Sequence, residues 1–261
     1  MLNNPQEYKR MAAVEQNHWW YRVLHQKSLI PLTPFSKREG GIKILDAGGG
    51  TGGLLLKLQA AGYTNILGTD ISTHALKICT ERGLNVMQSD VRDLPQKLAG
   101  KTFDVIICND VLCYFTMDEI PDIIEGFKSL LNYNGLLIMN NPAHASFSGT
   151  HDIAVGIKTR FRPRELENII MNYELLIMNS VQWPFLLSPL VYLVRKFQKK
   201  EQSDIDMPAG WINSILYSIC KFEMKLFKRA PFGSSVFIVA RKEWPRMDRT
   251  KFWMGKLDEC D

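Results

Sequence analysis

The sequence predicts an α/β fold in which helices cover both faces of a mostly parallel β-sheet. Short apolar segments typical of buried strands alternate with helical segments between residues 42 and 142, and this rhythm indicates parallel strands joined by helices. The stretch from Ile44 to Leu58 contains five glycines between an apolar run and a Leu-rich run, which is typical of a strand, a tight turn and a helix that approach a ligand closely. Two later strand segments flank a largely helical stretch, so we expect an antiparallel pair at one edge of the sheet.

The chain before this region is predicted to be helical. Residues 5–30 are rich in long side chains and end at Pro31, so we expect a helix there. Residues 31–41 contain two prolines and end in a glycine pair, which is typical of a linker.

Strands and helices then alternate in order. Five strand segments are expected at residues 42–48, 64–72, 84–95, 103–115 and 135–142, the third of them running into a loop. Helices are expected from the glycines through Ala61, over residues 73–83 and from Met117 to Leu131. The second of these helices stops at Gly83, because glycine is favoured just after a helix C-terminus.

The rhythm breaks after Pro142. We expect a helix over 161–173, a strand over 174–184, a helical insert over 185–229 and a closing strand over 233–243. The insert would then lie over the carboxyl ends of the strands, where ligands bind in open α/β sheets. The predicted parts are an N-terminal helical arm (1–36), a core (37–184), a helical lid insert (185–230), a closing strand (231–245) and a C-terminal tail (246–261).

Composition limits the classes of function. The chain has 261 residues, 46% of them hydrophobic and 23% charged, which suits one large domain and excludes wholesale disorder. The net charge of +5 is mild and the cations are scattered among acids, so a nucleic-acid partner is not expected. The five cysteines form no C-x-x-C pair, and we expect neither a disulfide framework nor a metal site. The polar start and the lack of an apolar segment of membrane-span length favour a cytoplasmic protein.

The glycine turn could serve either of two ligand classes, unless it is a plain packing turn. Gly48, Gly50 and Gly53 satisfy the G-x-G-x-x-G pattern of dinucleotide-binding proteins. Asp46 together with Gly48, Gly50 and Gly52 satisfies D-x-G-x-G-x-G, which resembles motif I of the class I S-adenosylmethionine-dependent methyltransferases. A carboxylate at Asp46 would repel a pyrophosphate but attract the ammonium group of S-adenosylmethionine, so the second interpretation is favoured over an NAD-dependent oxidoreductase.

Later strand ends extend this resemblance. Asp70 ends the second strand about twenty residues beyond the glycines, and a carboxylate there offers paired acceptors for the two hydroxyls of a ribose. By the resemblance, Asp90 accepts from the adenine amino group, Val91 contacts the adenine ring, and Asn109 lies near the methionyl part. These elements, in this order over residues 42–141, imply a Rossmann-like seven-stranded, mostly parallel sheet with an antiparallel closing strand, a helical N-terminal arm and a helical lid insert.

The segment EYKRMAAVEQNHWWYR resembles the E…HWW[FY]R lead-in of a broad bacterial methyltransferase family that acts mostly on small metabolites. The resemblance implies an arm that closes over the cofactor, although plain packing against the sheet is the alternative for the tryptophans. Residues 149–166 and 212–242 also resemble this family, but Cys113 and Tyr114 stand where many relatives carry a histidine. The predicted cofactor contacts are Trp20, Tyr21, Arg22, Asp46, Gly48, Gly50, Gly52, Asp70, Ile71, Asp90, Val91, Asn109 and Tyr114.

Methyl transfer from a sulfonium needs no metal, and most of its acceleration can come from holding the reacting atoms in line. A hydroxyl or amine acceptor also needs a proton acceptor. His151 beside Asp152 is the first candidate, since both follow the fifth strand on the ligand edge, and a plain loop feature is the alternative. His144 is a further candidate, with Tyr114 and Glu223 behind it.

The resemblance therefore implies an enzyme that transfers a methyl group from S-adenosylmethionine to an O or N atom of a small-molecule acceptor of natural-product or sugar-like type. The alternatives are a protein of this fold that binds cofactor without catalysis and an NAD-dependent oxidoreductase. The insert is interpreted as subdomain core, as an apolar lid, or, least favoured, as a surface for shallow membrane docking through residues 185–200. The sequence predicts neither the acceptor molecule nor the oligomeric state.

Overall fold

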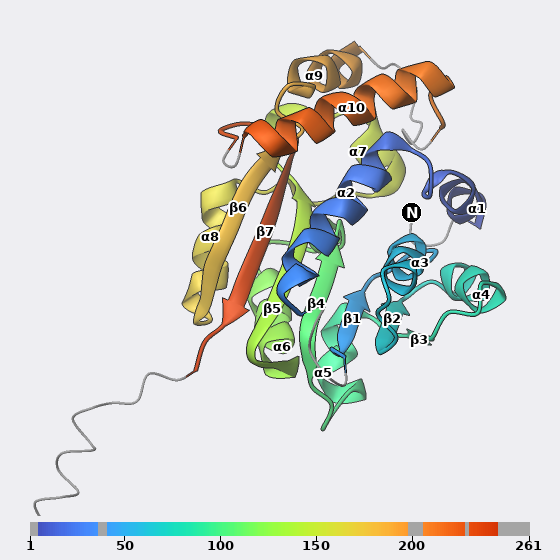
Figure 1. Cartoon of the computed structure of the whole chain (residues 1–261). Helices are drawn as coiled ribbons and strands as arrows, with labels where there is room; N and C mark the ends of the chain where they lie inside the picture. Colours follow the sequence, from blue (N-terminus) through green and yellow to red (C-terminus); the bar gives the residue numbers. More distant parts are fainter. Residues whose placement is uncertain (1–4, 36–40, 198–205, 228–229, 245–261) are drawn as a thin grey trace, which may run out of the picture.

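In a computed structural model of the protein, the described residues are 5–35, 41–197, 206–227 and 230–244. They form a seven-stranded sheet in the order β3-β2-β1-β4-β5-β7-β6 (Figure 1). The strands are β1 (Ile44–Ala47), β2 (Ile66–Asp70), β3 (Val86–Gln88), β4 (Phe103–Asn109), β5 (Leu131–Pro142), β6 (Leu175–Trp183) and β7 (Ser235–Lys242). Strands β1 to β5 pair in parallel, and β7 runs antiparallel to its neighbours β5 and β6. The predicted fold class is confirmed, including the antiparallel pair at one edge.

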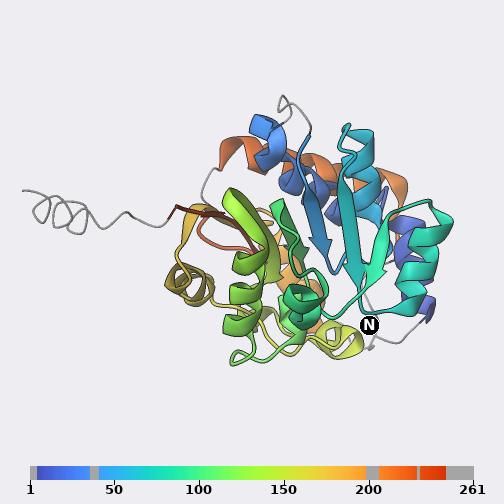
Figure 2. The same ribbon diagram turned by 90° about the horizontal axis from the view of Figure 1, so that it is seen from below.

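Helices cover both faces of this sheet (Figure 2). In β4, Val105 and Ile107 pack into one buried cluster while Ile106 packs into the other, so the strand is apolar without alternation because both its faces are buried. One cluster includes α5 (Leu94–Lys97), α6 (Ile120–Leu130) and α8 (Pro163–Asn172), and the other includes α2 (Trp19–Leu29), α3 (Gly53–Ala60) and α10 (Gly210–Leu226). The other α-helices are α1 (Pro5–Val14), α4 (Thr73–Glu81), α7 (Thr150–Val155) and α9 (Ser188–Phe197), and the short 3-10 turns are Ile30–Phe35, Val91–Asp93, Leu112–Tyr114 and Ala145–Phe147.

The N-terminal arm differs from the single helix predicted over residues 5–30. It is two helices, and the break between them ends at His18, whose side chain accepts a hydrogen bond from the Trp20 N–H over 3.2 Å and so caps α2. The prolines of the predicted linker lie in the turn Ile30–Phe35, because a fixed proline φ suits a 3-10 conformation. Residues 36–40 of that linker lie outside the described residues.

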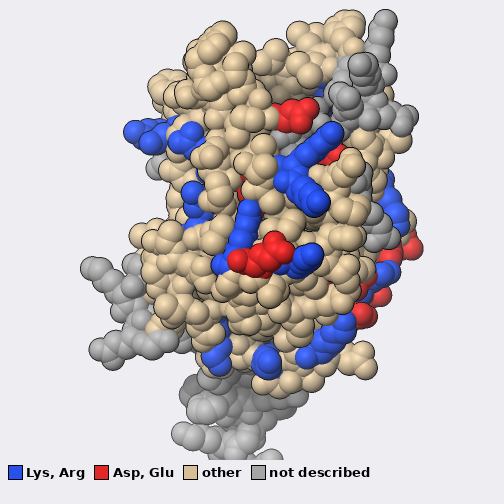
Figure 3. All heavy atoms as spheres, turned by 90° about the vertical axis from the view of Figure 1, so that its right-hand side faces the viewer, with Lys and Arg blue, Asp and Glu red and all other residues tan. Residues whose placement is uncertain are grey.

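The described part of the insert after β6 is largely helical, and it joins the arm. Asn213 of α10 accepts a hydrogen bond from the Trp19 N–H (2.7 Å) and donates one to the Asn17 carbonyl (2.9 Å). Helices α9 and α10 lie above the carboxyl ends of the parallel strands, and α2 runs from there across one face of the sheet (Figure 1). The side of the molecule in Figure 3 is mostly uncharged at its upper end, where α9 and α10 lie. The predicted tail, 246–261, lies outside the described residues.

Candidate active site

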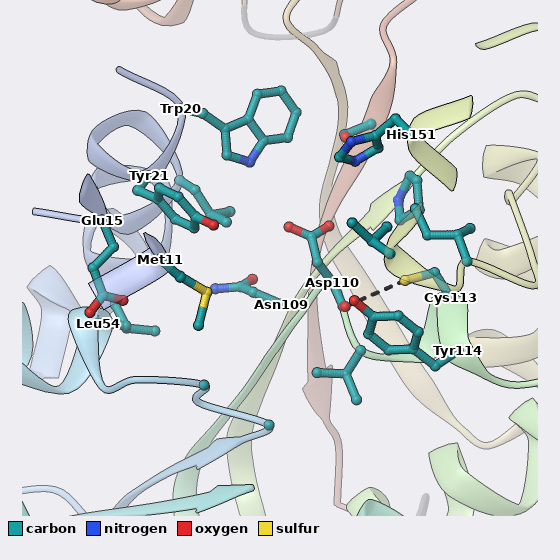
Figure 4. Close-up of a pocket in the computed structure, with 18 of the residues that line it drawn as sticks. Met11, Glu15, Trp20, Tyr21, Leu54, Asn109, Asp110, Cys113, Tyr114 and His151 are labelled. Atoms are coloured by element: carbon teal, nitrogen blue, oxygen red, sulfur yellow. Dashed lines mark hydrogen bonds between the residues drawn. The ribbon is translucent and has the colours of Figure 1, made fainter. Parts of the chain in front are cut away.

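A cavity of about 780 Å³ lies at the carboxyl ends of β1, β2, β4 and β5. Its walls come from the glycine turn after β1, from the strand ends, from the arm helices α1 and α2, and from the insert helices α9 and α10. This is the edge at which the sequence predicted the ligand, and Figure 4 shows side chains from these elements facing the cavity.

The glycine turn is shaped for close backbone approach. Gly48 and Gly50 line the cavity at φ values of +82° and +55°, where a side chain would be strained. The N–H groups of Gly48 and Gly49 both donate to the Thr69 carbonyl over 2.8 Å, which fixes the turn against β2. Gly52 lies outside the cavity lining, at the N-cap of α3 with a φ of 86°.

Asp46 lies beneath this turn and is almost completely buried, with 2% of its surface exposed. Among the described residues, its Oδ2 atom has no hydrogen-bond partner. Burial, followed by the charges of Asp70 and Glu15, raises the pKa of Asp46 to about 7. A buried carboxylate oxygen without a partner is costly unless a ligand satisfies it, so this position fits the cationic end of a ligand.

Asp70 is held rigidly at the end of β2. One carboxylate oxygen accepts the Gly50 N–H (2.9 Å) and the other accepts the Ser72 N–H (2.8 Å). Each oxygen keeps a further lone pair, so the pair of oxygens can still accept two ligand hydroxyls. Ile71 lines the cavity beside it.

Asp90 and Val91 line the same cavity after β3. The Asp90 carboxylate accepts the backbone N–H of Arg92 over 2.9 Å and pairs with the Arg92 guanidinium over 2.7 Å. The structure therefore brings together the strand-end acids that the sequence singled out.

Glu15 in the arm was not among the predicted site residues, although it is one of the two glutamates of the lead-in segment. It is buried, and it accepts hydrogen bonds from the Thr51 hydroxyl (2.7 Å), the Gly53 N–H (3.1 Å) and the Arg82 guanidinium. Its charge thus lies at the N-terminus of α3, where the helix dipole favours an anion. The contact fastens the arm onto the glycine turn.

The arm residues Trp20 and Tyr21 line the cavity, as predicted for this segment (Figure 4). The Trp20 ring also stacks on Trp183 with a centroid distance of 4.3 Å, so the packing role left open for it is present as well. Arg22 lies outside the lining, because its guanidinium is placed 3.7 Å from the centre of the Tyr217 ring on α10.

Asn109 ends β4 and Asp110 follows it, and both line the middle of the cavity (Figure 4). Asn109 donates to the Ser28 hydroxyl over 3.0 Å, and in the described part of the chain its buried Oδ1 has no hydrogen-bond partner. Asp110 has a φ of 55° and accepts a hydrogen bond from the Asn140 side chain over 2.8 Å. Burial raises the pKa of Asp110 to about 7, against the lowering effects of Asn140, Arg160 and Arg195.

Asp110 is the functional candidate that sequence reasoning missed. The available signal was a polar pair, Asn109 and Asp110, at the end of an otherwise apolar strand. A carboxylate with a pKa near neutrality inside a cavity is suited to accept and release a proton.

The three predicted catalytic residues are placed differently from one another. His151 lines the cavity from α7 (Figure 4), whereas Asp152 and His144 lie outside the lining. Asp152 forms a bidentate salt bridge with Arg160, with distances of 2.5 and 2.6 Å, because the short helix α7 turns it away from its neighbour. His144 contacts the Gln182 side chain over 2.5 Å and stacks on Phe232.

Of the remaining candidates, Tyr114 lines the cavity and Glu223 does not. Burial raises the pKa of Tyr114 well above its ordinary value, so this phenol stays protonated. Glu223 accepts the backbone N–H groups of Phe185 and Leu186, over 2.8 and 2.9 Å, at the start of the insert.

Two further groups of side chains line the cavity, one polar and one apolar. The polar wall carries His151, Lys158, Arg160 and Arg195. The apolar wall comes from the insert and consists of Leu187, Leu190, Val191, Val194 and Leu216. An acceptor with both polar and apolar parts fits these surroundings.

Comparison with known proteins agrees with this geometry. Residues 44–135 match a family model described as a methyltransferase domain. A protein of Geobacillus sp. (strain WCH70) named as a methyltransferase is 24% identical over 223 residues, which cover 78% of this chain and 86% of that protein. The crystal structure of a SAM-dependent methyltransferase from Archaeoglobus fulgidus is similar with a TM-score of 0.56 and 19% identity, over 83% of this chain and 93% of that one.

A further similar structure is magnesium protoporphyrin IX methyltransferase from Synechocystis with bound SAH, with a TM-score of 0.53 and 16% identity, over 84% of this chain and 82% of that one. At such identities the structural likeness shows the fold. The chain therefore has the fold of these S-adenosylmethionine-dependent methyltransferases, and its residues 44–135 are similar to a methyltransferase domain. The same comparisons support S-adenosylmethionine as the cofactor.

Proposed function

We propose that this protein transfers a methyl group from S-adenosylmethionine to an O or N atom of a small-molecule acceptor of natural-product or sugar-like type. The observation that carries the proposal is the buried Oδ2 of Asp46, which among the described residues has no partner and lies at a turn of positive-φ glycines. A diphosphate would be repelled by this carboxylate, whereas an ammonium group would satisfy it.

The residues at the cofactor end have complementary tasks. Asp46 and the backbone of Gly48 and Gly50 would hold the amino-acid part, and Asp70 would accept the ribose hydroxyls. Asp90 and Val91 would hold the adenine, as the resemblance implies. When bound, the cofactor supplies an electrophilic methyl group on a positively charged sulfur.

At the acceptor end we assign the proton-accepting role to Asp110. It faces the cavity, and its raised pKa lets it change protonation state near neutral pH. Asn140 holds one of its oxygens, which leaves the other to receive the proton of an acceptor hydroxyl or ammonium group. His151 remains the second candidate, since it lines the same end of the cavity.

Asp152 and His144 fit supporting roles better than the catalytic roles first predicted for them. The bidentate bond from Arg160 occupies both oxygens of Asp152 and places the guanidinium in the cavity wall. His144 lies outside the lining and supports the strand end instead.

Calorimetric titration of the purified full chain with S-adenosylhomocysteine and, separately, with NAD⁺ tests the cofactor half of the proposal. We expect binding of the first ligand alone, with loss of binding in Asp70→Ala and no change in Asp122→Asn, an exposed acid of α6 outside the cavity lining. Binding of NAD⁺ without S-adenosylhomocysteine would favour the oxidoreductase alternative.

Tritiated methyl transfer into an extract from a host that lacks this protein tests the catalytic half. We expect a labelled small molecule whose appearance requires Asp110. Cofactor binding without any labelled product would favour the alternative of a cofactor-binding protein without catalysis.

A further inference from the structure

The helices of the insert turn large apolar side chains toward solvent. Phe197 of α9 is 75% exposed, and on α10 Trp211 is 69%, Leu226 is 60% and Phe222 is 58% exposed. A surface helix normally presents its polar face outward and its apolar face to the core. Exposed apolar patches, where such side chains lie together, mark interaction sites.

The arrangement of α10 excludes the explanation that these side chains belong to the core. Trp211, Ile215, Phe222 and Leu226 recur at spacings of about 4, 7 and 4 residues, so they form one stripe along the helix. The opposite face is occupied, because the buried residues Asn213, Cys220 and Glu223 lie there and Asn213 bonds to the arm. Among the described residues, nothing covers the stripe.

The exposed charges within α9 and α10 have one sign. Lys221 and Lys225 lie one turn apart on α10 next to the apolar stripe, and Lys196 is exposed in the last turn of α9, whereas Arg195 lines the cavity. Within these two helices, both fully described, Glu223 is the one acid, and it is buried against the backbone N–H groups of Phe185 and Leu186. Trp, Phe and Leu on one face with Lys beside them is the composition of helices that lie in the interface of an anionic bilayer.

The apolar surface is continuous with the cavity. Leu190 and Val194 of α9 are each 51% exposed, and both also line the cavity. Leu187 and Leu216 extend the same apolar wall inward. A partner bound to the outer face of these helices would thus lie at the mouth of the cavity.

We propose that α9 and α10 form a docking surface for an anionic lipid bilayer. The helices would lie in the plane of the interface, with the apolar stripe among the acyl chains and Lys196, Lys221 and Lys225 near the headgroups. No helix of the described residues is long and apolar enough to cross a membrane. A consequence, which rests on the proposed function, is that the methyl acceptor is an amphiphile that enters the cavity from the bilayer.

Flotation of the full chain with vesicles tests the docking surface. We expect the protein to float with vesicles of phosphatidylcholine and phosphatidylglycerol, more weakly at high salt, and not with vesicles of phosphatidylcholine alone. Lys221→Gln/Lys225→Gln should weaken partitioning roughly 25-fold, at about fivefold for each lysine. Trp211→Ser/Phe222→Ser should weaken it at least about tenfold.

Matched variants separate this surface from general effects of charge and apolarity. Lys77→Gln/Lys101→Gln removes two exposed lysines elsewhere, and Met171→Ser/Met178→Ser removes two exposed apolar side chains from α8 and β6. Both control pairs should float like the unchanged protein, and all variants should bind S-adenosylhomocysteine with unchanged affinity. An equal loss of flotation in the controls would overturn the proposal.

Two further outcomes would also overturn it. One is the absence of vesicle binding together with a dimer in analytical ultracentrifugation that Trp211→Ser/Phe222→Ser converts to a monomer, which would make the surface a contact between two copies of the chain. The other is methyl label in the aqueous rather than the organic phase of an extracted reaction, which would overturn the amphiphilic acceptor. Neither outcome affects the S-adenosylhomocysteine titration, so failure here is distinguishable from failure of the proposed function.

Discussion

Asp110 and Asn140 are joined twice, once through the backbone and once through their side chains. The Asp110 N–H donates to the Asn140 carbonyl over 2.7 Å, and the Asn140 side chain donates to the Asp110 carboxylate over 2.8 Å. Asn140 is itself held by the indole N–H of Trp183, which donates to its side-chain oxygen over 2.7 Å. Residues at the ends of three strands thus fix one carboxylate in the cavity, with a pKa raised to about 7 by burial.

Asp110→Asn should lower kcat for methyl transfer at least about 100-fold, because the substituted amide cannot accept the proton. The change is mild for the structure, since Asn tolerates the positive φ and keeps an oxygen for the Asn140 bond. Steady-state kinetics, together with calorimetry of S-adenosylhomocysteine, measures both properties.

His151→Gln is the matched comparison for Asp110→Asn. It should reduce kcat less, because His151 is the second candidate at the same end of the cavity. A larger loss in His151→Gln than in Asp110→Asn would reverse the two assignments.

The affinity for S-adenosylmethionine should rise with pH through about 7, because the folded-state pKa of Asp46 is raised to that value by burial and by the charges of Asp70 and Glu15. Below this pH the carboxyl group is neutral and attracts the ammonium group less, so affinity should fall by up to about tenfold per pH unit. Calorimetry over a pH series checks this slope.

Asp46→Asn should bind the same ligand more weakly and with a flat pH dependence over that range. An unchanged slope in this variant would assign the titration to another group, Asp70 being the neighbour that faces Asp46.

His25 should make the protein sensitive to acid. Burial, and then the charge of Lys57, lowers the pKa of His25 to about 3 in the folded state, whereas the unfolded chain has the ordinary value of about 6.5. Between these values only the unfolded state binds the proton, so the stability present above pH 6.5 is lost as pH falls toward 3. The slope from this group is ~1.4 kcal/mol per pH unit.

Urea unfolding at several pH values measures that slope. In His25→Leu the free energy of unfolding should fall less steeply as pH decreases, by the slope that one bound proton contributes. His74→Gln, on the exposed side of α4, should have the same slope as the unchanged chain. Equal slopes in all three proteins would show that His25 does not titrate in this way.

The sequence predicted the strands well because the central ones, such as β1 and β4, are apolar on both faces and several are bounded by glycine, proline or an acid, all of which act locally. It also placed Asp46 and Asp70, since both end a strand beside the glycine turn. The role of Asp110 was not predicted, because its hydrogen bond comes from Asn140, thirty residues later, and its raised pKa comes from burial. Only the tertiary structure supplies both. The break between the two arm helices was not predicted for the same reason. Glu15 lies at this break, and its hydrogen bonds to Thr51 and Arg82 form only in the folded protein.

His151 and Asp152 are neighbours in the sequence, but the sequence did not predict that their side chains have different surroundings. Adjacent residues in a short helix point in different directions, so one faces the cavity and the other bonds to Arg160. Asp152 is the one buried against a cation, because that cation is Arg160, eight positions further along the chain. No local pattern distinguished the two side chains.

Asp152→Asn should therefore reduce stability more than chemistry. The Arg160 side chain is 3% exposed and the Asp152 side chain 11%, so loss of the carboxylate leaves a guanidinium buried without its counter-charge. We expect the free energy of unfolding to fall by about 3 kcal/mol. At a temperature where the variant remains folded, kcat should change less than in Asp110→Asn.

The double variant Asp152→Leu/Arg160→Met separates structure from catalysis at this pair. Replacing both charges with apolar side chains of similar size removes the desolvation penalty together with the attraction, so most of the lost stability should return. Thermal unfolding and kcat are measured on the same samples. A protein with Asp152→Asn that keeps its full unfolding temperature yet loses methyl transfer would contradict the mainly structural role given to Asp152, because its loss would then act on the reaction, directly or through Arg160, and not on stability.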